Sequence, residues 1–100
     1  MAVAVGVCRV KLRLPENHSL KGKRQVLKSL ISRLHNRFNV AAAETGDQDA
    51  WQIASVAVSC VSNDERHADQ VLASVVAFIR NERLDAEILD VETEVLWGLD

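Results

Sequence analysis

The apolar residues of this chain change their spacing several times, and each change marks a boundary between a strand and a helix. From Cys8 to Leu14 every second residue is apolar, and the residues between them are basic. This alternation predicts a strand with one buried face, which ends at Pro15 because proline lacks the N–H that a sheet requires. From Leu20 to about Arg37 the spacing lengthens to that of an amphipathic helix. The apolar stripe of this helix consists of Leu27, Leu30, Ile31, Leu34 and Phe38.

The second half of the chain repeats this succession. We expect a short strand over residues 39–45, a Gly-Asp turn after it, and a long half-buried strand over residues 51–61. Ser62 and Glu65 have the spacing of a capping box, which predicts the start of a second helix. The apolar stripe of that helix consists of Ala68, Val71, Leu72, Val75, Phe78 and Ile79.

A last strand over residues 87–97 completes the order βαββαβ. Its predicted inward side chains are Leu89, Val91, Val95 and Trp97, and its outward ones are Asp90, Glu92 and Glu94. One apolar face on each element predicts an α+β fold of two layers, in a single domain over residues 1–100. The leading topology is the ferredoxin-like βαββαβ arrangement, with an antiparallel four-stranded sheet and two helices on one face. There the last strand lies beside the first, so its acidic row is expected to neutralise the basic row of the first.

The charges are divided unevenly along the chain. Nine of its twelve Lys and Arg residues lie between Arg9 and Arg37, together with the single acid Glu16. From Glu44 to Asp100 there are thirteen acids and only three arginines, so the formal net charge of −2 conceals two oppositely charged halves. Such asymmetry points to a polyanionic partner.

The basic helix is the best candidate for binding an anion. Cations crowd its first turns, where the helix dipole favours acids and the free N–H groups attract phosphate. Gly22 lies among them and lowers helix propensity, which indicates a close approach of other atoms or a loose first turn. The predicted anion- or RNA-binding residues are His18, Lys21, Lys23, Arg24, Lys28, Arg33 and Arg37. The alternative is that these side chains form an ordinary solvated face.

A second candidate is the segment that joins the two middle strands, where acids, amides and one aromatic residue occur together. As a partner-binding loop it would use Glu44, Asp47, Gln48, Asp49 and Trp51. Its acids are too few and too loosely spaced for an EF-hand, so no metal is expected. The alternative is a simple hairpin in which Asp and Gly form the turn and Trp51 packs on an edge.

Several functions that this fold supports are excluded by the sequence. Two cysteines cannot hold an iron–sulfur cluster, and we expect Cys8 and Cys60 to pack in the core. The outward positions of the central strands carry no aromatic residue, which argues against base stacking of the RNA-recognition-motif kind. Because no nucleophile–base pair, phosphate loop or carboxylate pair is present, we expect neither an enzyme nor a cofactor. No apolar run is long enough to span a bilayer and the first residues lack a signal-peptide pattern, so we expect a cytoplasmic protein without a membrane partner.

An apolar patch is expected on the sheet face that points away from the helices. It would consist of Val3, Val5, Val7, Ile53 and Leu96, which share the outward parity of their strands. Exposed patches of this kind often mark an interface, so homodimerisation through the sheet face is an alternative use of this surface. A bulge near Gly6 would instead bury the same valines.

Two stretches of the chain resemble a known family. Residues 18–44 read HSLKGKRQVLKSLISRLHNRFNVAAAE, and residues 48–52 read QDAWQ. They resemble the YlxP-like family of small bacterial proteins, and the resemblance runs along essentially the whole chain. It implies a ferredoxin-like fold, but the function of that family is unknown, so it implies no catalytic residues. Its genes commonly lie beside those for translation initiation factor two and ribosome-binding factor A, which implies a role in ribosome maturation or translation.

Three functions therefore remain open. We favour a non-enzymatic module that binds structured RNA or a ribonucleoprotein such as a ribosomal subunit through the basic helix. The second is a protein-interaction or homodimerisation module that uses the sheet face or the hairpin. The third is regulation by a small anion, as in ACT-type domains of similar topology.

Overall fold

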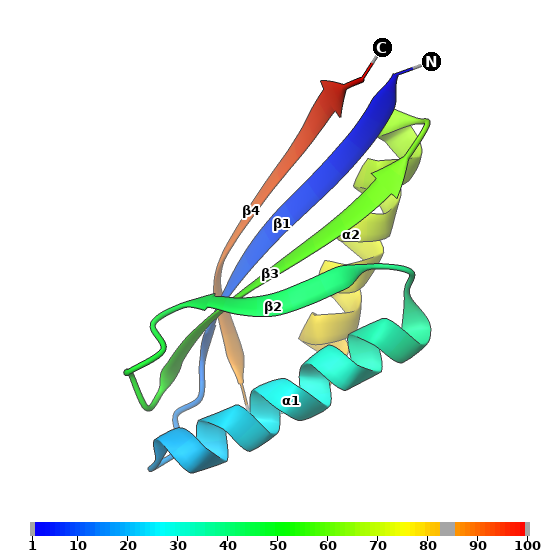
Figure 1. Ribbon diagram of the computed structural model, residues 1–100. Helices are drawn as coiled ribbons and strands as arrows, with labels where there is room; N and C mark the ends of the chain where they lie inside the picture. Colours follow the sequence, from blue (N-terminus) through cyan, green and yellow to red (C-terminus); the bar gives the residue numbers. More distant parts are fainter. Residues whose placement is uncertain (1, 83–85, 100) are drawn as a thin grey trace.

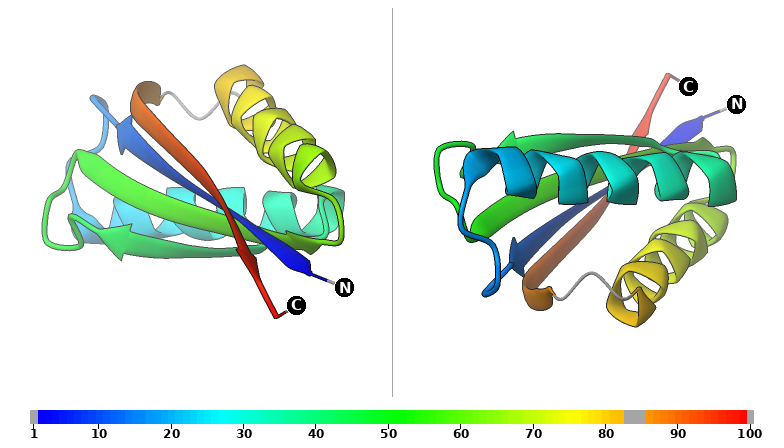
Figure 2. Two further views of the ribbon diagram at one scale, coloured as in Figure 1. Left: turned by 90° about the horizontal axis from the view of Figure 1, so that it is seen from above. Right: turned by 90° about the horizontal axis from the view of Figure 1, so that it is seen from below.

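Four strands and two helices make up the computed structural model, which describes residues 2–82 and 86–99. In chain order they are β1 (Val3–Arg13), α1 (Leu20–Arg37), β2 (Ala41–Gly46), β3 (Ile53–Ser62), α2 (Glu65–Asn81) and β4 (Glu87–Gly98). The strands form one antiparallel sheet in the order β2-β3-β1-β4 (Figure 1). Figure 2 shows the two helices diverging, with α1 along β2 and α2 across β1, β3 and β4. The predicted ferredoxin-like arrangement is confirmed.

The core lies between the sheet and the helices. Alternate residues of β1 and β3 are buried, as the period of two predicted, because the register of the two strands is continuous from Ala4 to Arg13. The helices contribute buried apolar side chains from one stripe each: Leu27, Leu30, Leu34, Ala68, Leu72, Val75 and Ile79. Since β1 has no bulge against β3, the valines near Gly6 keep their outward parity. Within the described residues, no helix has the length and apolar character that crossing a membrane requires.

A bulge in β4 overturns one prediction about its inward side chains. Lys11 of β1 pairs with Asp90, but the next residue, Leu12, pairs with Ile88, so Leu89 is an extra residue on β4. A bulge shifts the alternation of side chains, and Ile88 therefore packs on the core while Leu89 is 46% exposed. The prediction that Leu89 points inward is wrong for this reason. Beyond the bulge the expected parity returns, and Val91 and Val95 pack against the core.

The two helices begin at different kinds of cap. Ser19 caps α1, and its hydroxyl accepts a hydrogen bond from the Gly22 N–H at 3.0 Å. The cap of α2 is Asp64, whose carboxylate accepts from the Arg66 N–H, so the predicted capping box at Ser62 and Glu65 is wrong. Ser62 lies two residues before the observed cap, and its hydroxyl instead accepts from the Asp64 N–H. Either arrangement satisfies N–H groups that a helix start leaves free.

The acidic row of β4 lies beside the basic row of β1, as the topology predicted. Arg9 is paired in register with Glu92 and forms an ion pair with it, and this hydrogen-bonded contact raises the pKa of Arg9. Lys11 lies opposite Asp90, but its nearest carboxylate belongs to Asp47, at 3.9 Å. The cations of the sheet therefore have acidic neighbours within this chain.

Both cysteines are buried free thiols, so the free energy of unfolding should change with pH in the alkaline range. Burial raises the pKa of Cys8 and of Cys60 above the ordinary thiol value of 9.0. The unfolded chain therefore loses thiol protons first, and we expect the free energy of unfolding to fall as the pH rises through about 9.0. Urea unfolding of the wild type between neutral pH and pH 10 measures this slope. A Cys8→Ala/Cys60→Ala variant should show a flatter slope, and an unchanged slope would contradict the assignment.

Candidate functional site

Lys23 occupies a position that its charge did not predict. Its side chain is buried, with 1% of its surface exposed, on the core side of α1. The ammonium donates hydrogen bonds to the carbonyl oxygens of Asp47 at 2.7 Å, Ile53 at 3.2 Å and Gln48 at 3.3 Å. These bonds use the donors of the ammonium group, so the prediction that Lys23 belongs to an exposed anion-binding set requires correction. Lys23 instead holds the β2–β3 loop, residues 47–52, against α1.

Glu44 completes the surroundings of this ammonium. It lies on the helix side of β2, and its Oε2 is 3.2 Å from the Lys23 Nζ. The Oε2 atom is buried and makes no well-aligned hydrogen bond among the described residues, so the contact is an ion pair. A buried ammonium and carboxylate each carry a large desolvation cost when alone, which makes the two residues depend on each other.

The loop between β1 and α1 is tied to the same place. The Gln52 side chain donates to the carbonyl oxygens of Pro15 at 3.1 Å and Asn17 at 3.2 Å. The Asn17 side chain donates to the carbonyl oxygens of Ser19 and Trp51. A Cβ at Gly22 would overlap the Asn17 Oδ1, so the close approach that this glycine indicated is confirmed. The two candidate constellations of the sequence thus form one connected region at one end of the molecule.

Most polar groups of the β2–β3 loop are used within the chain. Asp47 adopts a left-handed backbone conformation (φ 59°), and its Oδ2 accepts from the Ser55 hydroxyl at 2.8 Å. Glu44 and the backbone of Gln48 contact Lys23 as described, so these three predicted partner residues serve first to hold the loop. Asp49 is exposed, and 57% of the Trp51 surface is exposed, so Trp51 does not pack closely on an edge.

The remaining cations of α1 fall into two groups. Arg33 forms an ion pair with Glu82, and the Arg37 guanidinium lies 5.5 Å from the centre of the Phe78 ring. These two predicted anion-binding residues therefore have partners near the end of α2. The second group is exposed and consists of Lys21, Arg24 and Lys28 on the other side of the helix, with His18 just before its start.

We call Lys21, Arg24 and Lys28, with His18 before the helix, the basic face of α1. The three helical residues are separated by three and four positions, so they share one side of the helix. None of them forms an ion pair within residues 2–82 and 86–99, and the first turn of α1 contains no acid. The charge of the basic face is therefore not compensated by an ion pair within the described chain.

Sequence reasoning missed the buried role of Lys23, although a signal was present. Lys23 precedes Leu27 by four residues, and the positions of Leu30 and Leu34 continue the same stripe. Extending the apolar stripe backwards by one turn places Lys23 on the core side. The residue type concealed the position, because lysine is seldom fully buried unless it is paired.

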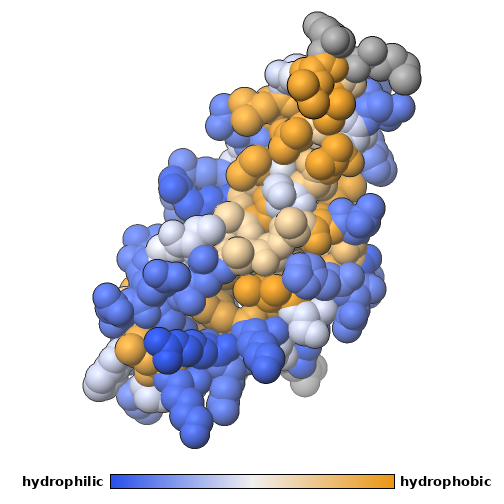
Figure 3. Space-filling model, in the orientation of Figure 1, coloured by the Kyte–Doolittle hydropathy of each residue, from blue (hydrophilic) through white to orange (hydrophobic). Residues whose placement is uncertain are grey.

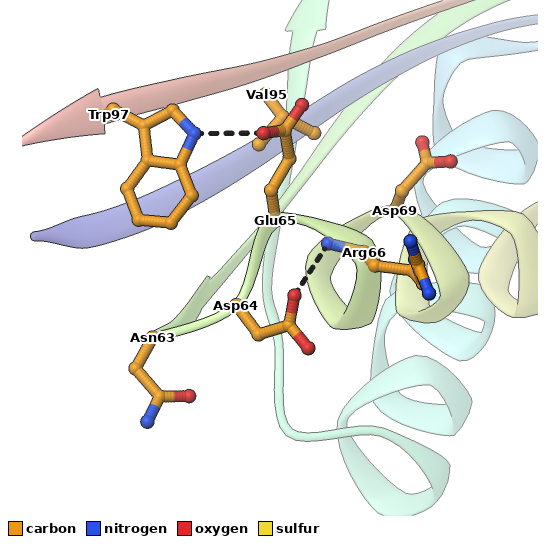
Figure 4. A pocket seen from close by; sticks show the side chains of 7 residues that line it. All are labelled: Asn63, Asp64, Glu65, Arg66, Asp69, Val95 and Trp97. Atoms are coloured by element: carbon orange, nitrogen blue, oxygen red, sulfur yellow. Dashed lines mark hydrogen bonds between the residues drawn. The ribbon is translucent and has the colours of Figure 1, made fainter.

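A hollow at the start of α2 was not predicted at all. Its lining consists of Asn63, Asp64, Glu65, Arg66, Asp69, Val95 and Trp97, as Figure 4 shows. Trp97 lies on the helix side of β4, as expected, and its indole N–H donates to Glu65 at 2.9 Å, but 49% of the residue's surface is exposed. The hollow carries three acids, and among the described residues no group of His, Cys, Asp or Glu is placed to hold a metal ion. It lies near the chain termini, far from the start of α1 (Figure 1).

The sheet face away from the helices, here called the open face, carries an apolar patch at the end where β1 begins. Val5 lies between Val61 of β3 and Leu96 of β4, which are 72% and 49% exposed. Val3 and Val7 flank this row on β1. Figure 3 shows the apolar side chains as a band across this face, bordered by hydrophilic ones.

Comparison with known proteins gives a family and a fold. The family model described as a protein of unknown function (DUF503) matches residues 5–93. An uncharacterized protein YlxP from Bacillus subtilis (strain 168) is 37% identical over 75 residues, which cover 75% of this chain and 82% of that protein.

One solved structure has a similar arrangement of elements. It is the crystal structure of a C-terminal segment of the alpha subunit of aIF2 from Pyrococcus abyssi, with a TM-score of 0.52 and 13% identity. The match covers 97% of this chain and 51% of that segment, so the chain spans about half the length of the segment it matches. At this identity the likeness concerns the fold alone.

Proposed function

The chain belongs to the DUF503 family of proteins of unknown function, and from this premise we propose that it is a non-catalytic module that binds structured RNA through the basic face of α1. The observation that carries the proposal is the different surroundings of the cations on the sheet and on the helix. Arg9 and Lys11 have acids beside them on the open face, whereas Lys21 and Lys28 have none among the described contacts. Uncompensated cations on one side of a helix are the usual phosphate contacts of nucleic-acid-binding proteins.

The start of α1 adds to the attraction for phosphate. The N-terminal end of a helix carries a partial positive charge, and Lys21 and Arg24 raise the potential there further. Ser19 satisfies the Gly22 N–H, and the Lys23 N–H bonds to the Ser19 carbonyl, so the cap and the buried lysine hold this turn in one position. A rigid helix end presents its cations without an ordering cost on binding.

Charge and shape would provide most of the recognition. The basic face carries no Phe, Tyr or Trp side chain on which bases could stack. Phosphate contacts fix the position of a protein on RNA without reading bases, and folded RNA offers a dense array of phosphates. We therefore propose a ribosomal RNA or a ribonucleoprotein as the ligand, in ribosome maturation or translation.

A salt series tests the proposal. With Lys21, Arg24 and Lys28 at the site, the logarithm of the affinity for a fragment of small-subunit ribosomal RNA should fall with the logarithm of salt concentration with a slope between about −2 and −3. A Lys21→Glu/Lys28→Glu variant should bind at least about tenfold more weakly and with a shallower slope. Fluorescence anisotropy of labelled RNA measures both quantities.

The matched control reverses the same charge elsewhere. Arg66 and Arg80 are exposed on α2, and an Arg66→Glu/Arg80→Glu variant has the same net charge as the test variant. It should keep most of the affinity, because its substitutions lie off the basic face. Equal loss in both variants would indicate a response to net charge alone, and salt-independent or absent binding by the wild type would overturn the proposal.

A further inference from the structure

Trp51 is a large aromatic residue that the chain leaves at its surface. It lies in the β2–β3 loop, and 57% of its surface is exposed. The indole N–H of Trp97, the other tryptophan, donates to Glu65, but the indole N–H of Trp51 makes no hydrogen bond within the described chain. An exposed indole forgoes the free energy that its burial would provide. The ring of Trp51 and its N–H are therefore available to a ligand.

The backbone of Trp51 is held in place, although the side chain is exposed. Its carbonyl oxygen accepts a hydrogen bond from the Asn17 side chain. The next residue, Gln52, accepts from the Leu14 N–H at 2.7 Å through its carbonyl oxygen and donates from its side chain to the Pro15 carbonyl at 3.1 Å. An aromatic ring on a fixed backbone loses little conformational entropy when it binds a ligand. Trp51 thus has the character of a rigid aromatic contact.

The same hydrogen bonds place Trp51 beside the start of α1. One nitrogen, the Asn17 Nδ2, donates both to the Trp51 carbonyl and, at 2.7 Å, to the carbonyl of Ser19, the N-cap of α1. Figures 1 and 2 show the β2–β3 loop alongside the first turn of this helix. His18 precedes the cap and Lys21 follows it by two residues, and both are exposed. An aromatic side chain and the first cations of the basic face therefore lie at the same end of the molecule.

We propose that Trp51 stacks on an unpaired base of the RNA whose phosphates contact the basic face of α1. The inference rests on the proposed function and adds the kind of RNA, which is a paired stem with an unpaired nucleotide beside it, as in a bulge or a loop. Proteins contact paired RNA through its phosphates and stack unpaired bases on aromatic side chains. Every base has a π face, so stacking on an indole requires no particular sequence.

Charge favours RNA over a protein as the partner at this end of the molecule. Lys21, Arg24 and Lys28 form no ion pair within the described chain, and a polyanion would neutralise all three together. The two loops also contain the exposed acids Glu16 and Asp49, which repel phosphate. The phosphates are therefore expected on the helix side of the indole, with only the base reaching over the β2–β3 loop.

Two RNA probes test the stacking contact. One is a blunt RNA duplex, and the other is the same duplex with a bulge of unpaired adenosines. Trp51→Ala should weaken binding of the bulged duplex at least about fivefold, because it removes the surface on which one base stacks. Its binding of the blunt duplex and its salt dependence should change little, since no cation is lost. Fluorescence anisotropy of the labelled duplexes measures these affinities.

Two further variants separate stacking from apolar contact in general. Trp51→Phe keeps an aromatic ring and should retain most of the affinity for the bulged duplex. Trp51→Leu keeps an apolar side chain without a ring and should lose about as much as Trp51→Ala does. Trp97→Ala is the matched control, because Trp97 is also half-exposed but lies near the chain termini, and it should bind both duplexes as the wild type does.

Indole fluorescence reports the contact directly. The chain has two tryptophans, so Trp97→Phe leaves Trp51 as the single indole. Its emission should be quenched when the bulged duplex binds, because a base stacked on the ring quenches indole emission. In Trp51→Phe the remaining indole is that of Trp97, and its emission should not change. Circular dichroism confirms that each variant is folded.

The outcomes distinguish failure of this inference from failure of the proposed function. A wild type that binds neither duplex would overturn both. A wild type that binds both duplexes with steep salt dependence, while Trp51→Ala binds the bulged duplex equally well and the Trp51 emission stays constant, would overturn the stacking contact alone. Trp51 would then be left for contact with a protein.

Discussion

Replacement of Lys23 by methionine is expected to lower the free energy of unfolding by about 3 kcal/mol. Methionine keeps the apolar stem of the side chain but removes the ammonium that contacts Glu44 and three loop carbonyls. The buried Glu44 oxygen then has no cation beside it, and the carbonyl of Asp47 loses its short hydrogen bond. Urea unfolding followed by circular dichroism measures the change.

Lys21→Met is the matched control for this prediction. Lys21 lies two residues earlier on the same helix and is exposed, so its replacement should change stability by no more than about 0.5 kcal/mol. Glu44→Leu should recover part of the loss when it is combined with Lys23→Met, because it removes the carboxylate left without a partner. Equal and small effects of Lys23→Met and Lys21→Met would contradict the buried contact.

Leu72→Ala is expected to cost about 2–5 kcal/mol, because Leu72 is 1% exposed at the centre of the core. Its side chain fills the space above Gly6, where an added Cβ would lie 2.9 Å from the Leu72 Cδ1 and 3.1 Å from the Cys60 Sγ. Gly6→Ala alone should therefore destabilise by about 1–3 kcal/mol through overpacking, since Gly6 lacks a positive φ and its backbone accepts alanine.

The double variant gives the decisive measurement. In the Leu72→Ala background the Cβ of Gly6→Ala enters the cavity that the leucine leaves, so it should stabilise rather than destabilise. The sum of the two single changes should then exceed the cost of the double variant by more than about 1 kcal/mol. Simple additivity would show that the two positions do not share this space.

The sequence was sufficient for the fold because each element shows its own period. The alternation in β1 and the stripe of α2 are local patterns that depend only on which face is buried, and the structure buries those faces. Leu89 was misassigned because a bulge is a property of two paired strands, and one strand alone does not reveal it. The cap at Asp64 was misassigned because Ser, Asn and Asp are adjacent and all have capping chemistry.

The candidate site was less predictable, for a physical reason. Charge identifies a side chain that can bind an anion, but only the fold determines whether other parts of the chain already contact it. The hydrogen-bond partners of Lys23 and Arg33 lie from 24 to 49 residues away in the sequence, and Arg37 contacts the distant ring of Phe78. No local sequence pattern indicates these partners. Lys21 and Lys28 remain exposed on the opposite side of the same helix.

β4 is an edge strand of the sheet, and this affects whether copies of the protein aggregate at high concentration. Its outer backbone edge could template continuous sheet growth, the first step toward fibrous aggregates. Antiparallel addition of a second β4 would set Asp90, Glu92 and Glu94 against the same acids, and like charges on adjacent strands repel. The bulge at Leu89 also interrupts the regular edge that such growth needs. The repulsion between the carboxylates of β4 thus opposes growth of the sheet by addition of further copies at this edge. It does so only while those groups are ionised.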